Sequence, residues 1–576
     1  MTWTGAQLVV KALEAQGVER VFGLPGVQNL ELYDALKDAA FEAVLVTHEL
    51  CAAFMADAYS RSTGKVGCSV LVPGPGLTNA STGLAESFLD SVPQVVIVPG
   101  PRNDIEKGFQ LHQVRQLDAI RPLVKAALHA ERVEDVFPLV SEAFALARGG
   151  EPGPAVVEIP YNLFQEKATI PPPAPAASKL AQIQSGLAPE EKRLKEIARA
   201  IEQAKQVGIY AGFGATDARA LLVRLAELLQ APVATTIAGR GVIPEDHPLS
   251  VGFGFGPAGS PLAEEVFGGC DLVLALACKF GEVATGAYGI KPPRNLIHVD
   301  INPDVLGRNL PASLTLQGDA RDVLEGLLEE LSRNPRPVNR PLQERIARER
   351  QRYFRTIEQS PEQSDGVNPA RLLWELRKLL ARDAILTTDS GAHQFWVVSC
   401  FPIFAARSYL TPTDYQSMGY SIPAMVSAKM AFPSRQVIGV VGDGGFLMTG
   451  SEIVTALRYK LNPVVLLFND GELGLIREAQ DRIYGRTSCI ELLNPDYELL
   501  ARAYGANYFC IQSDPEISAI LRQALASDRL AIVDARVRYR EHTRYFRGAA
   551  AASMSRMPLG LKLRLAARRI HRMFRM

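Results

Sequence analysis

Two aspartates that come after short apolar runs could hold a divalent cation. Asp443 comes after the run Val437–Val441, and Asp470 comes after the run Val464–Phe468. Such runs predict buried parallel strands, whose carboxyl ends meet at one edge of a sheet. Two carboxylates and the backbone carbonyl of Glu472 would form an all-oxygen site, which suits Mg²⁺ better than a soft metal.

The segment between the two aspartates predicts a glycine turn followed by a helix. Gly442, Gly444 and Gly445 would let backbone amides approach a diphosphate group closely. Thr449 and Glu452 have the spacing of a capping box, so we expect a helix to begin there. An ordinary strand–helix–strand unit with glycine turns would have the same pattern. Other parts of the chain must therefore decide whether this segment binds a cofactor.

The motif around these aspartates resembles the diphosphate motif of thiamine diphosphate (ThDP) enzymes. Residues 442–444 read Gly-Asp-Gly, and Asn469-Asp470 follows after 24 intervening residues. The usual ending in that family is Asn-Asn, and a carboxylate at position 470 can ligate the metal with extra negative charge. The resemblance implies ThDP and Mg²⁺ as cofactors, with Asp443, Asp470 and the Glu472 carbonyl as metal ligands.

Glu49 is expected where a strand ends and a helix begins. Partial burial at such a place raises the pKa of a carboxyl group unless a partner compensates. The surrounding stretch resembles the segment in which ThDP enzymes place a Glu against N1′ of the aminopyrimidine ring, where the two share a proton. A Glu that merely stabilises a helix N-terminus is the alternative interpretation.

Further stretches resemble parts of the ThDP site. Met418 matches the bulky apolar residue that holds the cofactor bent in that family, although a Met more often fills a core. The carbonyl of Gln416 would accept a hydrogen bond from the 4′-amino group, at a position where Gly is more usual. The other cofactor contacts that the resemblance implies are Pro25, Gly26, Asn79, Ala392 and His393.

Alternating apolar runs and helical stretches predict an α/β protein with three doubly wound parallel-sheet domains. We place an N-terminal domain at 1–168, a central Rossmann-like domain at 189–332 and a C-terminal domain at 345–540, with proline-rich joints at 170–188 and 334–342. In ThDP enzymes these are the pyrimidine-binding, central and diphosphate-binding domains. The two halves of one site come from different subunits there, which implies a homodimer or homotetramer.

Composition excludes several other classes of protein. The 576 residues are 47% hydrophobic and 22% charged, as expected of globular domains. No acidic residue follows Glu541, whereas nine Arg or Lys do, which leaves 53 basic against 62 acidic side chains in residues 1–541. Such a body is not expected to bind nucleic acid. The tail, 541–576, predicts a basic amphipathic helix over 559–576 that could contact an acidic membrane surface or the acidic body.

The seven cysteines show neither CxxC nor zinc-ligand spacing. They are typical of reduced thiols, and the N-terminal stretch lacks the features of a signal peptide. We therefore expect a cytoplasmic protein. No apolar run approaches about 18 residues, so no membrane span is expected.

The substrate is indicated by a second resemblance. Phe109-Gln110, with Lys125 downstream, resembles acetolactate synthase large subunits, in which a Phe–Gln pair and a Lys border the substrate site; here Leu111-His112 follows in place of the usual Glu. This resemblance implies that Glu49, Phe109, Gln110 and Lys125 serve a carboligase. Such an enzyme decarboxylates a 2-oxo acid, with pyruvate expected, and transfers the two-carbon unit to a second carbonyl.

Three alternatives stay open. A ThDP-dependent 2-oxo acid decarboxylase is disfavoured because the chain has no His-His pair and has Val27 and Val72 where benzoylformate decarboxylases have Ser and His. A 2-hydroxyacyl-CoA lyase and a catalytically silent paralogue are the others. FAD is possible but not expected, because 279–283 reads Lys-Phe-Gly-Glu-Val where FAD-containing relatives have an Arg-Phe-Asp-Asp-Arg-like stretch.

Overall fold

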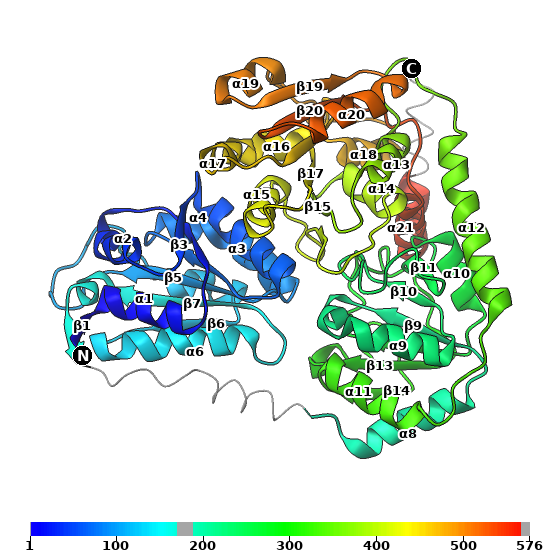
Figure 1. Ribbon diagram of the computed structural model, residues 1–576, viewed down its shortest axis with the longest axis horizontal. Helices are drawn as coiled ribbons and strands as arrows, with labels where there is room; N and C mark the ends of the chain where they lie inside the picture. Colours follow the sequence, from blue (N-terminus) through cyan, green and yellow to red (C-terminus); the bar gives the residue numbers. More distant parts are fainter. Residues whose placement is uncertain (1, 170–187, 566–576) are drawn as a thin grey trace. The chain divides into compact units, whose positions relative to one another are not determined.

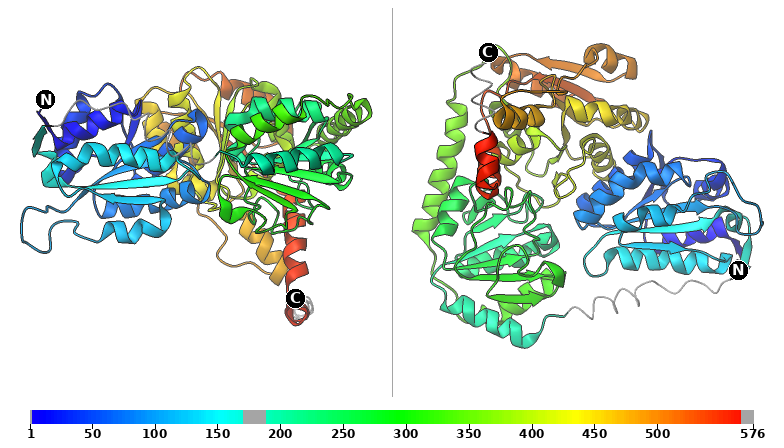
Figure 2. Two further views of the ribbon diagram at one scale, coloured as in Figure 1. Left: turned by 90° about the horizontal axis from the view of Figure 1, so that it is seen from below. Right: turned by 180° about the vertical axis from the view of Figure 1, so that it is seen from behind.

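A computed structural model describes residues 2–169 and 188–565 of the chain (Figures 1 and 2). These residues form three six-stranded sheets in which every strand pairing is parallel. The predicted α/β fold with three parallel sheets is therefore confirmed. The proline-rich joint at 170–188 lies almost wholly outside the described residues, as does the end of the tail, 566–576.

The first sheet has the order β3-β2-β4-β5-β7-β6. Helices α1 and α6 pack against each other, as do α3 and α4. The strands are β2 Arg20–Gly23, β3 Glu42–Leu45, β4 Gly67–Val70, β5 Gln94–Gly100, β6 Ala126–His129 and β7 Pro154–Pro160. The helices are α1 Gly5–Ala15, α2 Leu30–Lys37, α3 Glu49–Thr63, α4 Pro75–Leu89, α5 Gln116–Ile120 and α6 Val136–Arg148. A short antiparallel pair, β1 Thr2–Thr4 with β8 Lys167–Thr169, joins the two ends of this region.

The central sheet has the order β11-β10-β9-β12-β13-β14, and helix α11 packs on α8 and α9. Its strands are β9 Val207–Ala211, β10 Val233–Thr235, β11 Ser250–Phe253, β12 Leu272–Leu276, β13 Leu296–Asp300 and β14 Leu314–Gln317. Its helices are α8 Glu191–Gln203, α9 Arg219–Leu229, α10 Pro261–Gly268 and α11 Ala320–Leu331. In the stretch where FAD-containing relatives differ, Phe280 is buried and stacks on Tyr210, with ring centroids 5.4 Å apart.

The third sheet has the order β16-β15-β17-β18-β20-β19. Its strands are β15 Ile385–Thr388, β16 Tyr409–Leu410, β17 Val437–Gly442, β18 Val464–Asn469, β19 Asn507–Ile511 and β20 Ala531–Arg536. The helices of this part of the chain are α12 Arg340–Glu358, α13 Pro369–Leu379, α14 Ala392–Cys400, α15 Ser421–Ala431, α16 Asp443–Thr449, α17 Ile453–Arg458, α18 Gly474–Tyr484, α19 Tyr497–Tyr504, α20 Ile517–Leu525 and α21 Arg544–Arg556.

The chain folds into two compact units. The first unit contains the described residues up to 169 together with 415–433 and 449–461, and the second unit contains the other described residues. Helices α15 and α17 thus belong to the first unit, although the strands on either side of them in the chain belong to the second. Within the first unit α15 packs on α3, where Tyr420, just before α15, makes an edge contact with Phe54.

Both runs that lead to the candidate aspartates are strands, as predicted. Residues 437–441 in β17 and 464–468 in β18 are all buried, as expected of parallel strands that helices cover on both faces. Strand β6 was not predicted, because its sequence Ala-Ala-Leu-His contains no β-branched residue.

A helical stretch begins after Thr449 as predicted, but the capping box does not form. Thr449 ends α16 and is the N-cap residue of a 3-10 turn over Gly450–Glu452 without a side-chain cap hydrogen bond, and α17 follows this turn. The Thr449 hydroxyl donates to the carbonyl of Gly419, and the Glu452 carboxylate accepts the backbone N–H of Thr47. Tertiary contacts within the first unit therefore use both side chains that a local cap would have needed.

Within residues 2–169 and 188–565 no helix is long and apolar enough to cross a bilayer. The described part of the tail contains α21 and a further helical turn over 559–565, with Leu559 and Leu563 exposed. Contact of the tail with a membrane surface or with the acidic body stays a prediction.

Gly67→Ala should destabilise the protein. A Cβ at position 67 would lie 2.0 Å from the carbonyl oxygen of Ala56 in α3, and backbone atoms cannot move aside cheaply. Overpacking of this kind costs roughly 1–3 kcal/mol, so we expect a lower unfolding midpoint by differential scanning fluorimetry. Gly268→Ala is the matched control, because no heavy atom lies within 4 Å of its added Cβ. Equal midpoints for the two variants would contradict the packing of α3 on β4.

Candidate active site

Asp443 lies at the carboxyl end of β17 and is almost fully buried. Its Oδ1 accepts the backbone N–H of Gly444 at 3.0 Å, and its Oδ2 accepts that of Gly471 at 2.7 Å. Burial nevertheless raises the pKa of this carboxyl group. Hydrogen bonds to neutral amides therefore do not fully replace the water that Asp443 has lost.

Asp470 directly follows the neighbouring strand, β18. Burial, and then the charges of Asp443 and Glu472, raise the pKa of Asp470 to about 7. The structure therefore brings the two aspartates close enough to repel each other, as the strand order predicts. Asp443 is buried and Asp470 half-buried, and neither carboxylate has a positive partner among the described residues. Such a pair fits a divalent cation, which would relieve this repulsion.

The side chains alone do not complete a metal site. Within the described ranges no group of three or more His, Cys, Asp or Glu side chains is arranged to hold a metal ion. The predicted set has only two carboxylates and the backbone carbonyl of Glu472, whose own side chain pairs with Arg477 at 3.0 Å. The rest of the coordination shell would have to come from a bound cofactor and water.

Asn494 belongs to this site and was missed in the sequence. Its Nδ2 donates to Asp443 Oδ2 at 2.8 Å and to Asn469 Oδ1 at 3.1 Å. Its Oδ1 is buried and has no hydrogen-bond partner among the described residues, so it can accept from a ligand or bind a cation. Asn494 lies in an irregular stretch shortly before α19, where an Asn is typical of a turn, and no motif indicates it.

His393 lies at the same edge of the third sheet, near the start of α14. A Cβ on Gly442 would come within 3.1 Å of the His393 ring, so the close approach favours glycine there. Burial lowers the pKa of His393 to about 4, so the ring is neutral at pH 7. Its Nε2 is buried without a partner among the described residues. This orphaned nitrogen and the glycine cradle fit an anionic group such as a diphosphate.

The other predicted residues of this half lie beside His393. Ala392 begins α14, and Gly444 and Gly445 are in the first turn of α16. A Cβ on Gly445 would come within 2.0 Å of Asp389 Oδ2, so no larger residue fits there. The second unit thus gathers the predicted diphosphate and metal residues at the carboxyl ends of β15, β17 and β18.

Glu49 is the first residue of α3, at the carboxyl end of β3. It is half-buried, and its Oε2 accepts a hydrogen bond from Asn79 Nδ2 at 3.0 Å. Pro25 and Gly26 form a nearby turn, in which a Cβ on Gly26 would come within 2.4 Å of Val72. The first unit therefore brings together the residues predicted to surround the pyrimidine ring.

Gln416 and Met418 also belong to the first unit. Gln416 has φ +59°, in the left-handed region that favours glycine, which explains why the family usually has Gly at this position. Met418 is half-buried, so it is not a simple core residue. Its partial exposure is compatible with a side chain that contacts a ligand.

Of the three residues predicted to border the substrate, the structure places Lys125 apart from Glu49. Phe109 is fully exposed, and Gln110 forms hydrogen bonds with the backbone of Arg102 at 2.9 Å. Lys125 directly precedes β6, at the amino ends of the parallel strands, whereas Glu49 follows β3 at their carboxyl ends. Its ammonium group donates to the carbonyl of Gly149, and burial lowers its pKa to about 8. Residues 126–129 form β6, which was not predicted, and because this strand begins directly after Lys125 it places Lys125 at the amino edge of the sheet.

Comparison with known families agrees with this geometry. The N-terminal TPP binding domain of thiamine pyrophosphate (TPP) enzymes matches residues 3–120, the central domain matches 194–327, and the C-terminal TPP binding domain matches 389–535. Thiamine pyrophosphate is another name for ThDP. The chain therefore belongs to the thiamine pyrophosphate enzyme family, and it is a ThDP-dependent enzyme.

Curated relatives resemble the chain over nearly its whole length. The probable acetolactate synthase large subunit of Methanocaldococcus jannaschii is 32% identical over 542 residues, which cover 92% of this chain and 91% of the relative. The acetolactate synthase isozyme 3 large subunit of Escherichia coli K12 is 32% identical, over 94% and 96% of the two chains. The acetolactate synthase large subunit of Parasynechococcus marenigrum is 34% identical, over 94% and 88%.

Asp470→Asn should stabilise the cation-free protein at alkaline pH. The pKa of Asp470 is raised from 3.8 to about 7, so its contribution to stability is present below pH 4 and is lost as pH rises through 7. The loss is on the order of 2–4 kcal/mol. In EDTA at pH 8 the variant should therefore unfold at a higher temperature than wild type, and the difference should shrink towards pH 5.

The exposed Asp528→Asn is the control and should show no such pH-dependent gain. A variant at position 470 that is no more stable than wild type at pH 8 would contradict the repulsion between the two aspartates.

Proposed function

We propose that this protein is a ThDP- and Mg²⁺-dependent carboligase that acts on 2-oxo acids, as acetolactate synthases do. It would decarboxylate pyruvate and transfer the two-carbon unit to a second carbonyl compound. The observation that carries the proposal is the similarity to acetolactate synthase large subunits, which spans more than nine tenths of this chain at 32–34% identity.

The second unit would hold the charged end of the cofactor. Asp443 and Asp470 would bind Mg²⁺ with the Glu472 carbonyl, and phosphate oxygens would complete the shell. The neutral His393 would donate its ring N–H to the diphosphate, without the cost of burying a second positive charge. The amides beside Gly442 would line the same anion.

The first unit would hold the pyrimidine ring. When bound, ThDP supplies a carbon nucleophile and an electron sink for decarboxylation. Glu49 would hold a proton at N1′, and Asn79 fixes the Glu49 carboxylate through its hydrogen bond. Met418 would press on the cofactor, while the carbonyl of Gln416 would accept from its 4′-amino group.

An assembly of chains is part of the proposal. We infer a homodimer or homotetramer, in which residues from two chains complete each site. The relatives are named large subunits, so a second type of subunit is a candidate partner for this chain as well. A cytoplasmic location also stays a prediction.

A simple 2-oxo acid decarboxylase is the second candidate. The Gln110 amide is satisfied by the backbone of Arg102, and Lys125 is apart from Glu49. Two of the residues expected to recognise a second substrate are therefore otherwise engaged within this chain. A decarboxylase would not need them.

The product formed from pyruvate distinguishes the two candidates. With Mg²⁺ and ThDP the purified full chain should release carbon dioxide and form acetolactate, detected by its conversion to acetoin in acid. Free acetaldehyde with carbon dioxide would favour the decarboxylase. No product from pyruvate or from a wider set of 2-oxo acids would contradict both and favour a silent paralogue.

Glu49→Gln should lower turnover by at least about 100-fold, because an amide cannot exchange the proton that the carboxylate holds. ThDP affinity, measured by isothermal titration calorimetry, should fall far less, since the amide still fills the site. Glu134→Gln, an exposed change in the same unit, should leave both quantities unchanged. Full turnover in Glu49→Gln would reject the assigned role.

A further inference from the structure

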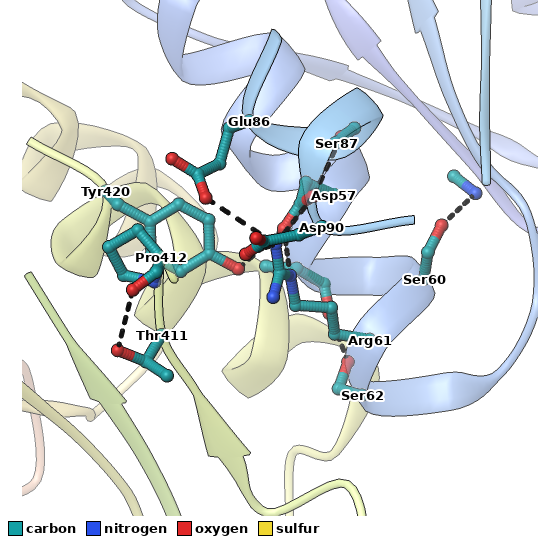
Figure 3. A network of polar contacts seen from close by, with 12 residues as sticks. Asp57, Ser60, Arg61, Ser62, Glu86, Ser87, Asp90, Thr411, Pro412 and Tyr420 are labelled. Atoms are coloured by element: carbon teal, nitrogen blue, oxygen red, sulfur yellow. Dashed lines mark hydrogen bonds and ion pairs between the residues drawn. The ribbon is translucent and has the colours of Figure 1, made fainter. Parts of the chain in front are cut away.

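A buried ionic cluster joins helices α3 and α4 within the first unit (Figure 3). Arg61 lies at its centre, 2.6 Å from Asp57 Oδ1 and 2.9 Å from Asp90 Oδ2. Glu86 Oε1 is 3.9 Å from the same guanidinium. All four side chains are at most 2% exposed. Three carboxylates therefore surround one positive charge where no water is available.

The cluster cannot hold three negative charges against one positive charge at low cost. Burial and the neighbouring Asp90 raise the pKa of Glu86 well above its usual range. Asp57 is held in place by two hydroxyl donors as well as by Arg61: Ser87 and Tyr420 donate to it, each at 2.7 Å. Glu86 Oε1 faces Arg61 at 3.9 Å, and its Oε2 is left for another contact.

The other contact of Glu86 is with the turn formed by residues 416–418, which is proposed to hold the cofactor. Glu86 Oε2 accepts the backbone N–H of Ser417 at 3.0 Å. Ser417 lies between Gln416, in its left-handed conformation, and Met418. The same turn is held at its far end by the bond from Tyr420 to Asp57. Both ends of the turn are therefore tied to one cluster on α3 and α4.

A second buried carboxylate holds the turn that leads to Glu49. Glu452 is fully buried, and its Oε2 accepts the backbone N–H of Thr47 at 3.0 Å and also the Thr47 hydroxyl. Thr47 is two residues before Glu49. Each of the two turns is thus held by a carboxylate from a part of the chain more than 300 residues away in sequence.

We propose that Glu86 and Glu452 are positioning residues, which hold the backbones of the turns 416–418 and 47–49 so that their side chains and carbonyls can meet the pyrimidine ring. The inference rests on the proposed cofactor contacts of Gln416, Met418 and Glu49. Neither carboxylate touches the cofactor itself. Each carboxylate accepts a hydrogen bond from a backbone N–H. The neutral side-chain oxygen of a glutamine could accept the same hydrogen bond.

Glu86→Leu and Glu86→Gln test the proposal as a pair, because only Gln keeps an oxygen for the Ser417 amide. Hydrogen–deuterium exchange is measured on the cofactor-free full chain. The backbone amides of residues 415–422 should exchange faster than wild type in the Leu variant and at the wild-type rate in the Gln variant. ThDP affinity at fixed Mg²⁺ should fall between about 5- and 100-fold in the Leu variant, the range expected for a buried amide left unpaired. The Gln variant should stay within about threefold of wild type.

Asp514→Leu is the matched control. Like Glu86, Asp514 is a buried carboxylate that accepts hydrogen bonds from the backbone, here the N–H groups of Gln363 and Asn368 at 2.8 Å. Unlike Glu86, it belongs to the second unit. It should lower the unfolding midpoint without changing exchange at 415–422. If Glu86→Leu does not fold, Tyr420→Phe removes one hydroxyl and should raise exchange in the same segment.

Unchanged exchange and unchanged ThDP affinity in a folded Glu86→Leu would overturn the proposal. So would a Gln variant as impaired as the Leu variant, since a negative charge would then be required. Exchange needs no turnover, so failure of the proposed 2-oxo acid chemistry would leave this result intact and distinguishable. Glu452→Leu and Glu452→Gln should give the same pair of results for residues 44–50.

Discussion

The satisfaction of backbone hydrogen bonds in parallel strands constrains everything else in this protein. A parallel sheet is covered by helices on both faces, so its strands are apolar on both sides and offer no place for charge. Residues 437–441 and 464–468 meet this condition completely. In these two strands the charged groups that matter to the site come directly after the apolar run. Because all strands of a sheet run the same way, the groups that follow them collect at one edge.

Two clusters of carboxylates in this protein reach opposite electrostatic solutions. Around Arg61 the protein supplies its own positive charge to three carboxylates, and the pKa of Glu86 is raised. Around Asp443 and Asp470 no cationic side chain of the described residues pairs with either carboxylate, and both carboxyl pKa values are raised. The first arrangement is typical of a fixed framework. The second is typical of a site whose final partner comes from solution.

The sequence predicts those parts of the fold and site that depend on neighbours along the chain. Residues 437–441 and 464–468 could be predicted as strands because contiguous apolar runs bounded by turn residues have few other structures open to them. Glu49 and Asp443 could be found because each follows such a run. Asn494, Glu86 and Glu452 could not, because their contacts reach residues 25 to several hundred positions away. The capping box failed for the same reason, since a distant backbone outcompeted the local one.

The interleaving of the two units has a consequence for the growing chain. Helix α3 packs on α15, which is made more than 350 residues later. At 5–20 residues per second, synthesis would leave the apolar face of α3 without this partner for roughly 20 to 70 seconds. The N-terminal sheet can form early. The compact unit that contains this sheet cannot be completed until residues 415–433 and 449–461 have left the ribosome. Protection of that face during synthesis is therefore a requirement that the order of segments along the chain imposes.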